Sequence, residues 1–154
     1  MLIRRATKND LNDLAGIFSR AFNKASEEIW TPKTAREYLK YCFERRPDLF
    51  FAAVEKSSIV GGILGEIFPL WEGPVLAEVE IFIDPKYQNK GTGKLLFRKI
   101  VEEAERKYKI KSVKFIADSS KNFPMSWYEK IGMEKTCWVF MEGDAEKVLE
   151  NLKR

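Results

Sequence analysis

Two glycines separated by one residue, Gly91 and Gly93, lie between the basic residues Lys90 and Lys94. Glycine has no Cβ, so a ligand can approach the backbone closely at both positions. Apolar residues take helical spacing after Gly93, which places the two glycines where a helix begins. The first N–H groups of a helix have no partners inside it, and the helix dipole adds partial positive charge there. The segment therefore predicts a site for a phosphate or pyrophosphate group.

Two familiar glycine loops do not fit this segment. A dinucleotide-binding fingerprint needs a third glycine where this sequence has Leu96. A Walker loop needs Ser or Thr directly after the Gly-Lys pair, where this sequence has Leu95. It also needs a glycine at the position of Gln88. The phosphate ligand must be of another class.

The stretch Gln88–Gly93 resembles the acetyl-CoA loop of the GNAT N-acetyltransferase superfamily, whose pattern is Gln/Arg-x-x-Gly-x-Gly/Ala. The family pattern follows a strand that ends in an apolar-x-Pro step, and Ile83-Asp84-Pro85 supplies that step. Proline ends a strand because it has no N–H to donate to the ladder. The alternative that stays open is a basic strand-to-helix turn without a ligand.

The resemblance implies which residues hold the cosubstrate acetyl-CoA. In the family the strand before the loop separates from its neighbour, and its backbone bonds the pantetheine arm, here at Ile81, Phe82 and Ile83. The residues implied for the pyrophosphate are Asn89, Lys90, Gly91, Thr92, Gly93 and Lys94. Gln88 is expected to shape the loop. The family's further CoA-binding asparagine falls at Lys121, which could meet a phosphate. Asn122, one residue later, is the candidate asparagine for CoA binding.

A second segment, Trp127–Met133, is similar to the family's aromatic-Tyr-x-Lys-x-Gly-Phe motif, with Met133 in place of phenylalanine. By that resemblance Tyr128 is the general acid that protonates the leaving thiolate. The ordinary pKa of tyrosine, about 10, lies above that of a thiol, about 8.5, so the hydroxyl can donate the proton. The alternative is a tyrosine that only packs beside Trp127.

An amine attacks a thioester only after it has lost a proton, and this sequence has no histidine to accept that proton. Glu78 and Glu80 are the candidate bases, with Glu80 preferred. They are two residues apart on the motif strand, so regular alternation predicts that they point to the same side of the sheet. The N–H of Ile83 is the candidate for polarising the thioester carbonyl. We expect direct attack by the amine in a ternary complex, with no covalent acyl-enzyme.

The acceptor is expected to be a small-molecule or peptide amine. Its pocket is predicted from the first two helices and the loop before the motif strand. The aromatic candidates are Phe22, Trp30 and Trp71, and the acidic candidates are Glu27 and Glu28. Aromatic residues at helical spacing also fit a plain core role. A non-catalytic CoA-binding regulatory module is the main alternative function.

Composition narrows the remaining classes. The chain has 154 residues, 27 basic against 23 acidic, and a sequence pI near 9.0. These charges are mixed along the chain, so we expect no nucleic-acid partner. The absence of histidine excludes a Ser-His-Asp triad and most zinc sites, and we expect no metal. No run of about 20 apolar residues and no signal-peptide pattern is present, so we expect no membrane partner and a cytoplasmic location.

The elements needed to position these groups follow from hydrophobic periodicity. We predict strands at about residues 2–6, 49–55, 59–68, 75–83, 112–117 and 133–141. Helices are predicted after Thr7-Lys8-Asn9-Asp10, after Thr31-Pro32, at 91–107, at 122–131 and at 144–153. Their order predicts a single α/β (α+β) domain over residues 1–154. Its mixed, mostly antiparallel central sheet has helices on both faces and, by the resemblance, a splayed parallel strand pair. The apolar last strand and helix could form a homodimer contact.

Overall fold

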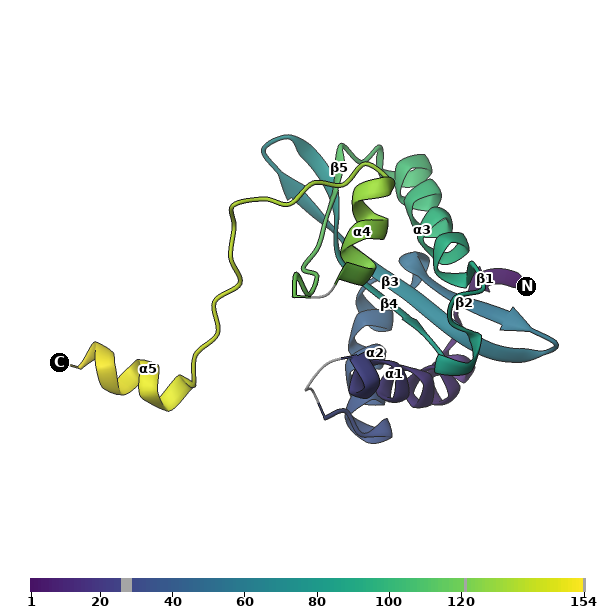
Figure 1. Ribbon diagram of the computed structural model, residues 1–154, viewed down its shortest axis with the longest axis horizontal. Coiled ribbons are helices and arrows are strands. Elements are labelled where there is room, and N and C mark those ends of the chain that lie inside the picture. Colours follow the sequence, from purple (N-terminus) through teal and green to yellow (C-terminus); the bar gives the residue numbers. More distant parts are fainter. Residues whose placement is uncertain (26–28, 121, 154) are drawn as a thin grey trace. The chain divides into compact units, whose positions relative to one another are not determined.

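The computed structural model describes residues 1–25, 29–120 and 122–153. The chain divides into two units, Met1–Phe115 and Ile116–Arg154. The first unit holds one five-stranded sheet whose spatial order equals the chain order (Figure 1). Its strands are β1 (Leu2–Arg5), β2 (Phe50–Glu55), β3 (Ser58–Leu70), β4 (Gly73–Ile83) and β5 (Ser112–Lys114). The single domain predicted over residues 1–154 stays a prediction.

The strands from β1 to β4 pair antiparallel in succession, and β5 runs parallel to β4. This confirms the predicted mixed, mostly antiparallel sheet. The parallel pair is reached through a crossover that contains α3 (Thr92–Tyr108), as parallel pairing requires. The pairing itself is short, and β5 ends three residues before the predicted limit of 117.

Helices cover both faces of the sheet, as predicted (Figure 1). On one face lie α1 (Leu11–Ala25) and α2 (Pro32–Arg45), and the ring centroid of Phe18 in α1 lies 5.0 Å from that of Phe82 in β4. On the other face lies α3, whose Leu96 and Ile100 are fully buried. Because both faces are covered, four consecutive residues of β2, Phe50–Ala53, are buried without polar alternation.

The helix starts predicted from the sequence are confirmed. The carboxylate of Asp10 accepts hydrogen bonds from the N–H and hydroxyl of Thr7 and two more from the guanidinium of Arg4, at 2.7–2.9 Å. The hydrogen bonds from Thr7 cap η1 (Lys8–Asp10), a short 3-10 turn that leads into α1. At α2, the hydroxyl of Thr31 accepts a bond from the N–H of Thr34, with Pro32 at the first helical position.

Glycines in β3 permit a close approach that larger residues would block. A Cβ on Gly61 would lie 2.8 Å from the carbonyl oxygen of Phe82, and one on Gly62 would lie 2.6 Å from the Phe82 ring. Gly65 lies opposite a bulge in β4. It is the one residue between Leu64 and Glu66 in β3, whereas two residues of β4 separate the partners of Leu64 and Glu66. Close approach at Gly61 and Gly62 and the bulge at Gly65 therefore account for glycine in the interior of β3.

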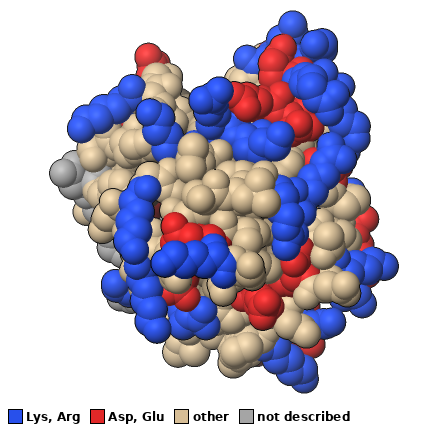
Figure 2. Space-filling model, turned by 90° about the vertical axis from the view of Figure 1, so that its right-hand side faces the viewer, with Lys and Arg blue, Asp and Glu red and all other residues tan. Residues whose placement is uncertain are grey.

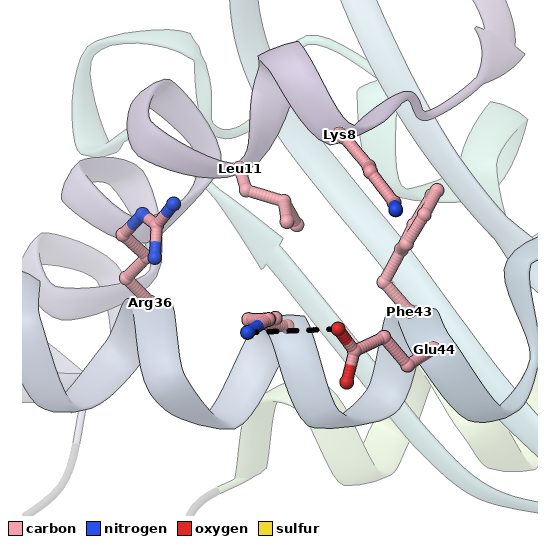
Figure 3. Close-up of a pocket in the computed structure, with 6 residues that line it drawn as sticks. Lys8, Leu11, Arg36, Phe43 and Glu44 are labelled. Carbon is pink, nitrogen blue, oxygen red and sulfur yellow. Dashed lines mark ion pairs between the residues drawn. The ribbon is translucent and has the colours of Figure 1, made fainter.

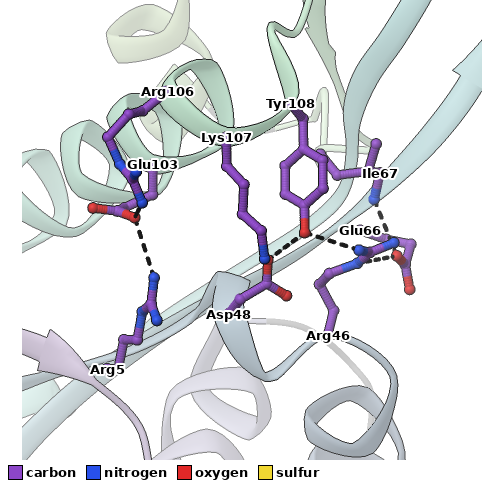
Figure 4. Close-up of polar contacts among 9 residues, drawn as sticks. All are labelled: Arg5, Arg46, Asp48, Glu66, Ile67, Glu103, Arg106, Lys107 and Tyr108. Carbon is purple, nitrogen blue, oxygen red and sulfur yellow. Dashed lines mark hydrogen bonds and ion pairs between the residues drawn. The ribbon is translucent and has the colours of Figure 1, made fainter.

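A polar network joins the C-terminal end of α3 to β3 and to η2 (Pro47–Leu49) (Figure 4). The hydroxyl of Tyr108 donates to Asp48 and accepts from Arg46. Arg46 also donates to the carboxylate of Glu66, 2.8 Å away, and that carboxylate accepts the N–H of Ile67. The network holds β3 directly beyond the bulge.

A loop and a strand predicted from the sequence are wrong. Residues 69–74 were expected to form a loop, but β3 and β4 extend into a tight turn at Trp71-Glu72 because each strand supplies a partner for the other. Residues 133–141 were expected to form a strand and do not. Their apolar alternation provides strand propensity, but a strand exists only where another strand pairs with it.

The second unit contains two helices, α4 (Asn122–Lys130) and α5 (Ala145–Leu152). Gly132, in the turn after α4, has a φ of +90°, a conformation that glycine adopts readily. The predicted end of this helix at residue 131 is confirmed to within one residue. The side chain of Asp144 caps α5 by accepting the N–H of Lys147, which confirms the predicted start. Within the described ranges no helix has the length and apolar character needed to cross a membrane.

Candidate functional site

The connection from β4 to α3 is fixed at its base by hydrogen bonds. The N–H of Asp84 donates to the carbonyl of Val60 in β3, and its carboxylate forms a 2.7 Å ion pair with Arg20 of α1. After η3 (Pro85–Tyr87), the side-chain amide of Gln88 donates to the carbonyl of Ile83. Gln88 thus makes the loop-shaping contact expected of it.

The backbone then turns sharply into α3. Asn89 and Gly91 have φ values of +61° and +80°, in the left-handed region that glycine adopts most readily. A Cβ added to Gly91 would have no protein atom within 4 Å, so the space beside this residue is open. The first helical hydrogen bond runs from the N–H of Leu95 to the carbonyl of Gly91. The three N–H groups of residues 92–94 precede it and have no acceptor inside the helix.

These groups fit a diphosphate. They offer backbone donors beside open space, and the exposed side chains of Lys90 and Lys94 add positive charge. The ammonium of Lys90 lies 5.0 Å from the ring centre of Tyr87. Thr92 is 1% exposed, and in the described part of the chain its hydroxyl oxygen has no hydrogen-bond partner. An unsatisfied polar atom at this turn is a further feature that a bound anion would suit.

The motif strand continues beyond its parallel partner. The last β4–β5 pair is Ala77 with Lys114, whereas β4 runs on to Ile83. On the other side, the bond from Asp84 N–H to Val60 and the antiparallel register place the backbone groups of Phe82 toward β3. Alternation then turns those of Ile81 and Ile83 away from β3. Of the three residues predicted to hold pantetheine, these two have backbone groups on the side where β5 has ended.

Glu78 is one of the two residues in the bulge of β4, and Glu80 directly follows the bulge. Glu78 has a φ of +48°, so the regular alternation from which their common side was predicted is interrupted. The charges of both carboxylates nevertheless affect the pKa of Tyr38 in α2. Burial is the largest cause that raises the pKa of the Tyr38 hydroxyl, and the negative charges of Glu80 and Glu78 raise it further. Burial also raises the pKa of the Cys42 thiol one turn later, with a smaller contribution from Glu80.

An aromatic cluster stands on the same face. Trp30 and Tyr38 have ring centroids 5.5 Å apart, and Phe18 lies 4.3 Å from Phe22 and 5.1 Å from Trp30. Two predicted acceptor residues, Phe22 and Trp30, are therefore brought together. The sequence gives no signal that places Tyr38 near the glutamates, so Tyr38 was not among the predicted site residues.

Trp71, another predicted acceptor residue, does not join this cluster. Trp71 lies at the β3–β4 turn, is 88% exposed, and has the ammonium of Lys114 4.8 Å from its ring centre. Glu27 and Glu28 lie outside the described residues, as does Lys121.

Tyr128 lies on α4 in the second unit. Its ring centroid is 5.1 Å from that of Trp127, and its carbonyl accepts the N–H of Met133. Asn122 is the first residue of α4, and its side chain lies outside the described part of the structure. The catalytic and cosubstrate roles of these two residues remain predictions.

A hollow elsewhere on the first unit is lined by residues of η1, α1 and α2 (Figure 3). Lys8, Arg36 and Glu44 are among its lining residues, and Lys40 forms a 3.6 Å ion pair with Glu44. None of the lining residues belongs to β4 or to the glycine loop. On the face shown in Figure 2, acidic side chains lie among the basic ones.

Comparisons with known proteins agree on one family. The model of the acetyltransferase (GNAT) family matches residues 11–133. An uncharacterized N-acetyltransferase from Methanocaldococcus jannaschii is 27% identical over 139 residues, which cover 86% of this chain and 60% of that protein. One from Archaeoglobus fulgidus is 29% identical over 115 residues, 71% of this chain and 78% of that protein. The chain thus spans well under two thirds of the Methanocaldococcus relative.

A solved structure shares the fold. An aminoglycoside N-acetyltransferase in complex with CoA superposes with a TM-score of 0.74, over 94% of each chain and at 16% identity. Identity this low supports similarity of fold alone.

Proposed function

Because the chain belongs to the acetyltransferase (GNAT) family, we propose that it is an N-acetyltransferase that transfers an acetyl group from acetyl-CoA to a primary amine. The single observation that carries the proposal is the turn into α3, where the N–H groups of residues 92–94 have no acceptor inside the helix and the space beside Gly91 is open. The free side of β4 at Ile81 and Ile83 provides further backbone groups for the pantetheine arm. The CoA bound to the aminoglycoside N-acetyltransferase of the same fold is consistent with this choice of cosubstrate.

The proposed reaction is direct attack in a ternary complex. Glu80 accepts a proton from the acceptor ammonium, directly or through water, with Glu78 as the second candidate. The N–H of Ile83 stabilises the oxyanion that develops when the amine nitrogen bonds to the thioester carbon. The C–S bond then breaks, and Tyr128 donates a proton to the leaving thiolate. The second proton that the nitrogen loses returns the Tyr128 phenolate to its neutral form through water, and Glu80 releases its proton to solvent. The products are the acetylated amine and CoA.

The acceptor is proposed to be a small-molecule or peptide amine that binds on the α1–α2 face of β4. Phe22 and Trp30 lie on that face with Tyr38, and Glu80 is electrostatically coupled to Tyr38. A cytoplasmic location and a homodimer remain expectations from the sequence.

The decisive experiment separates an enzyme from a CoA-binding module without catalysis. Acetyl-CoA binding is measured by calorimetry, and CoA release is followed with a thiol reagent over a panel of amines. Replacing Tyr128 with phenylalanine should slow turnover by about 10²–10⁴-fold while CoA still binds, because only the donated proton is lost. Tyr87→Phe, a tyrosine beside the loop, is the matched control and should keep most of the activity.

Three results would count against parts of the proposal. Absence of CoA binding to the native protein would remove the cosubstrate assignment. Binding without turnover for any amine would favour the non-catalytic module. Unchanged turnover in Tyr128→Phe would reject the general-acid role alone.

A further inference from the structure

We propose that Glu78 is a specificity-determining residue that disfavours acceptor amines carrying a carboxylate next to the reacting nitrogen. The inference rests on the proposed function and names the substrate class of the same site. It would make amines without a neighbouring negative charge the preferred acceptors, and free α-amino acids poor ones.

The position of Glu78 in β4 is the first argument. It is the residue directly after Ala77, where pairing between β4 and β5 ends, and it is exposed. Its side chain therefore stands where the two strands part. The pantetheine arm is proposed to bind further along the same strand, at Ile81 and Ile83, on the side where β5 has ended. An acceptor that approaches the thioester therefore enters the electrostatic field of this carboxylate.

The backbone of Glu78 is the second argument. A φ of +48° is uncommon for any residue with a Cβ, and glycine would adopt it without strain. Such strained positions cluster at functional sites, where the side chain is retained despite the conformational cost. The bulge needs a residue in this conformation, but it does not need a carboxylate. The charge at position 78 therefore requires its own explanation.

Electrostatics on the α1–α2 face provide the third argument. Glu78 and Glu80 both raise the pKa of Tyr38, so their negative fields overlap at the aromatic cluster. Three arginines within or directly after these helices are engaged by acidic residues. Arg45 and Arg46 pair with Glu66, and Arg20 pairs with Asp84. An ammonium is therefore attracted to this face, whereas a carboxylate attached near it is repelled.

The test uses two pairs of amines that each have one amino group and differ only by a carboxylate next to it, isoamylamine against leucine and tyramine against tyrosine. Initial rates of CoA release give kcat/KM for each. Rates are taken over a range of pH so that the different amine pKa values are corrected for. In the native protein we expect the amine without the carboxylate to be favoured at least tenfold in each pair.

Glu78→Gln keeps the shape of the side chain and removes its charge. We expect it to narrow the preference to about threefold or less, mainly by improving the two amino acids. Glu105→Gln is the matched control, because it removes one charge from an exposed position on α3, which covers the other face of the sheet. It should leave the preference intact. Glu78→Gly, which also relieves the backbone, should behave like Glu78→Gln if charge and not geometry sets the preference.

The remaining outcomes overturn the inference in distinguishable ways. Equal rates within each pair, or a preference for the amino acids, contradict it directly. A uniform fall for all four amines in Glu78→Gln would make Glu78 the proton acceptor and not a selector. If none of the four is acetylated while CoA binds, the stated substrate class is wrong and peptide acceptors remain for the proposed function. If CoA does not bind either, the proposed function fails as well.

Discussion

The two faces of the sheet at β4 offer candidate binding groups of different kinds. On the α3 face, the candidate groups are main-chain N–H groups at residues 92–94, beside a glycine whose missing Cβ leaves open space. On the α1–α2 face, the candidate groups are side chains from separate elements, such as Trp30, Tyr38 and Glu80. The first set is built by a single local turn. The second exists only after two helices have packed on the sheet.

This difference explains what each face can tolerate. Main-chain recognition depends on the path of the backbone and on the absence of side chains, so an added charge disrupts it strongly while an added methyl group does not. Side-chain recognition depends on tight packing beneath it, so an added methyl group in the wrong place is costly. Four substitutions and one pH series test these expectations.

The largest effect is expected at Gly93. A Cβ there would lie 3.4 Å from the Ile83 side chain and 3.7 Å from Ile81, which is ordinary contact. Gly93→Asp should therefore keep the fold but weaken CoA binding on the order of 100-fold, because it places a negative charge beside the diphosphate. Gly93→Ala is the matched control and should change affinity far less. Calorimetric titration measures both, and equal affinities for native protein and Gly93→Asp would break the assignment of this face.

The second effect concerns packing under the acceptor face. In Gly62→Ala the new methyl group would lie 2.6 Å from the Phe82 ring and 2.9 Å from the Leu14 side chain. Such overpacking should lower the free energy of unfolding by about 1–3 kcal/mol. Gly93→Ala should be neutral or slightly stabilising, since alanine favours helices. Urea denaturation of the two variants compares the faces directly, and similar stabilities would remove the contrast.

The third effect is a pH dependence at the start of the helix that carries Phe18. The hydrogen bonds from Arg4 are the largest cause that lowers the pKa of Asp10, from 3.8 to about 2, against the opposing effect of burial. Because the folded-state pKa lies below the unfolded one, the stabilisation is present above pH 4 and is lost as the pH falls toward 2. Asp10→Asn should therefore cost about 1–2 kcal/mol at neutral pH and little at pH 2. Chemical denaturation at several pH values checks this, and a constant difference would contradict it.

The smallest effect is expected at the bulge. Glu78→Gly replaces a strained left-handed residue with one that adopts this conformation freely. The conformational gain is offset by the greater entropy of glycine in the unfolded chain. We expect stability to change by less than about 1 kcal/mol, in contrast with Gly62→Ala. A large loss would mean that the Glu78 side chain is structural.

The same contrast accounts for what the sequence could predict. The glycine loop, the proline that ends β4 and both capped helix starts depend on a few neighbouring residues, and the structure has them as predicted. Tyr38 could not be identified in this way, because its proximity to Glu80 depends on the packing of α2 against β4. The strand predicted at 133–141 failed for a related reason, since alternation cannot supply a pairing partner. The common side of Glu78 and Glu80 was inferred from regular alternation, and the bulge at Glu78 removes that basis.

Strand order has a consequence for assembly. Each strand of the sheet lies beside the one that precedes it in the chain, from β1 to β5. No strand must enter between two that are already paired, so the sheet can grow in one direction as synthesis proceeds. The side of β4 proposed for pantetheine is added late, after the hairpin with β3 has formed. A nascent chain would thus pair β4 with β3 before it could engage the proposed cosubstrate.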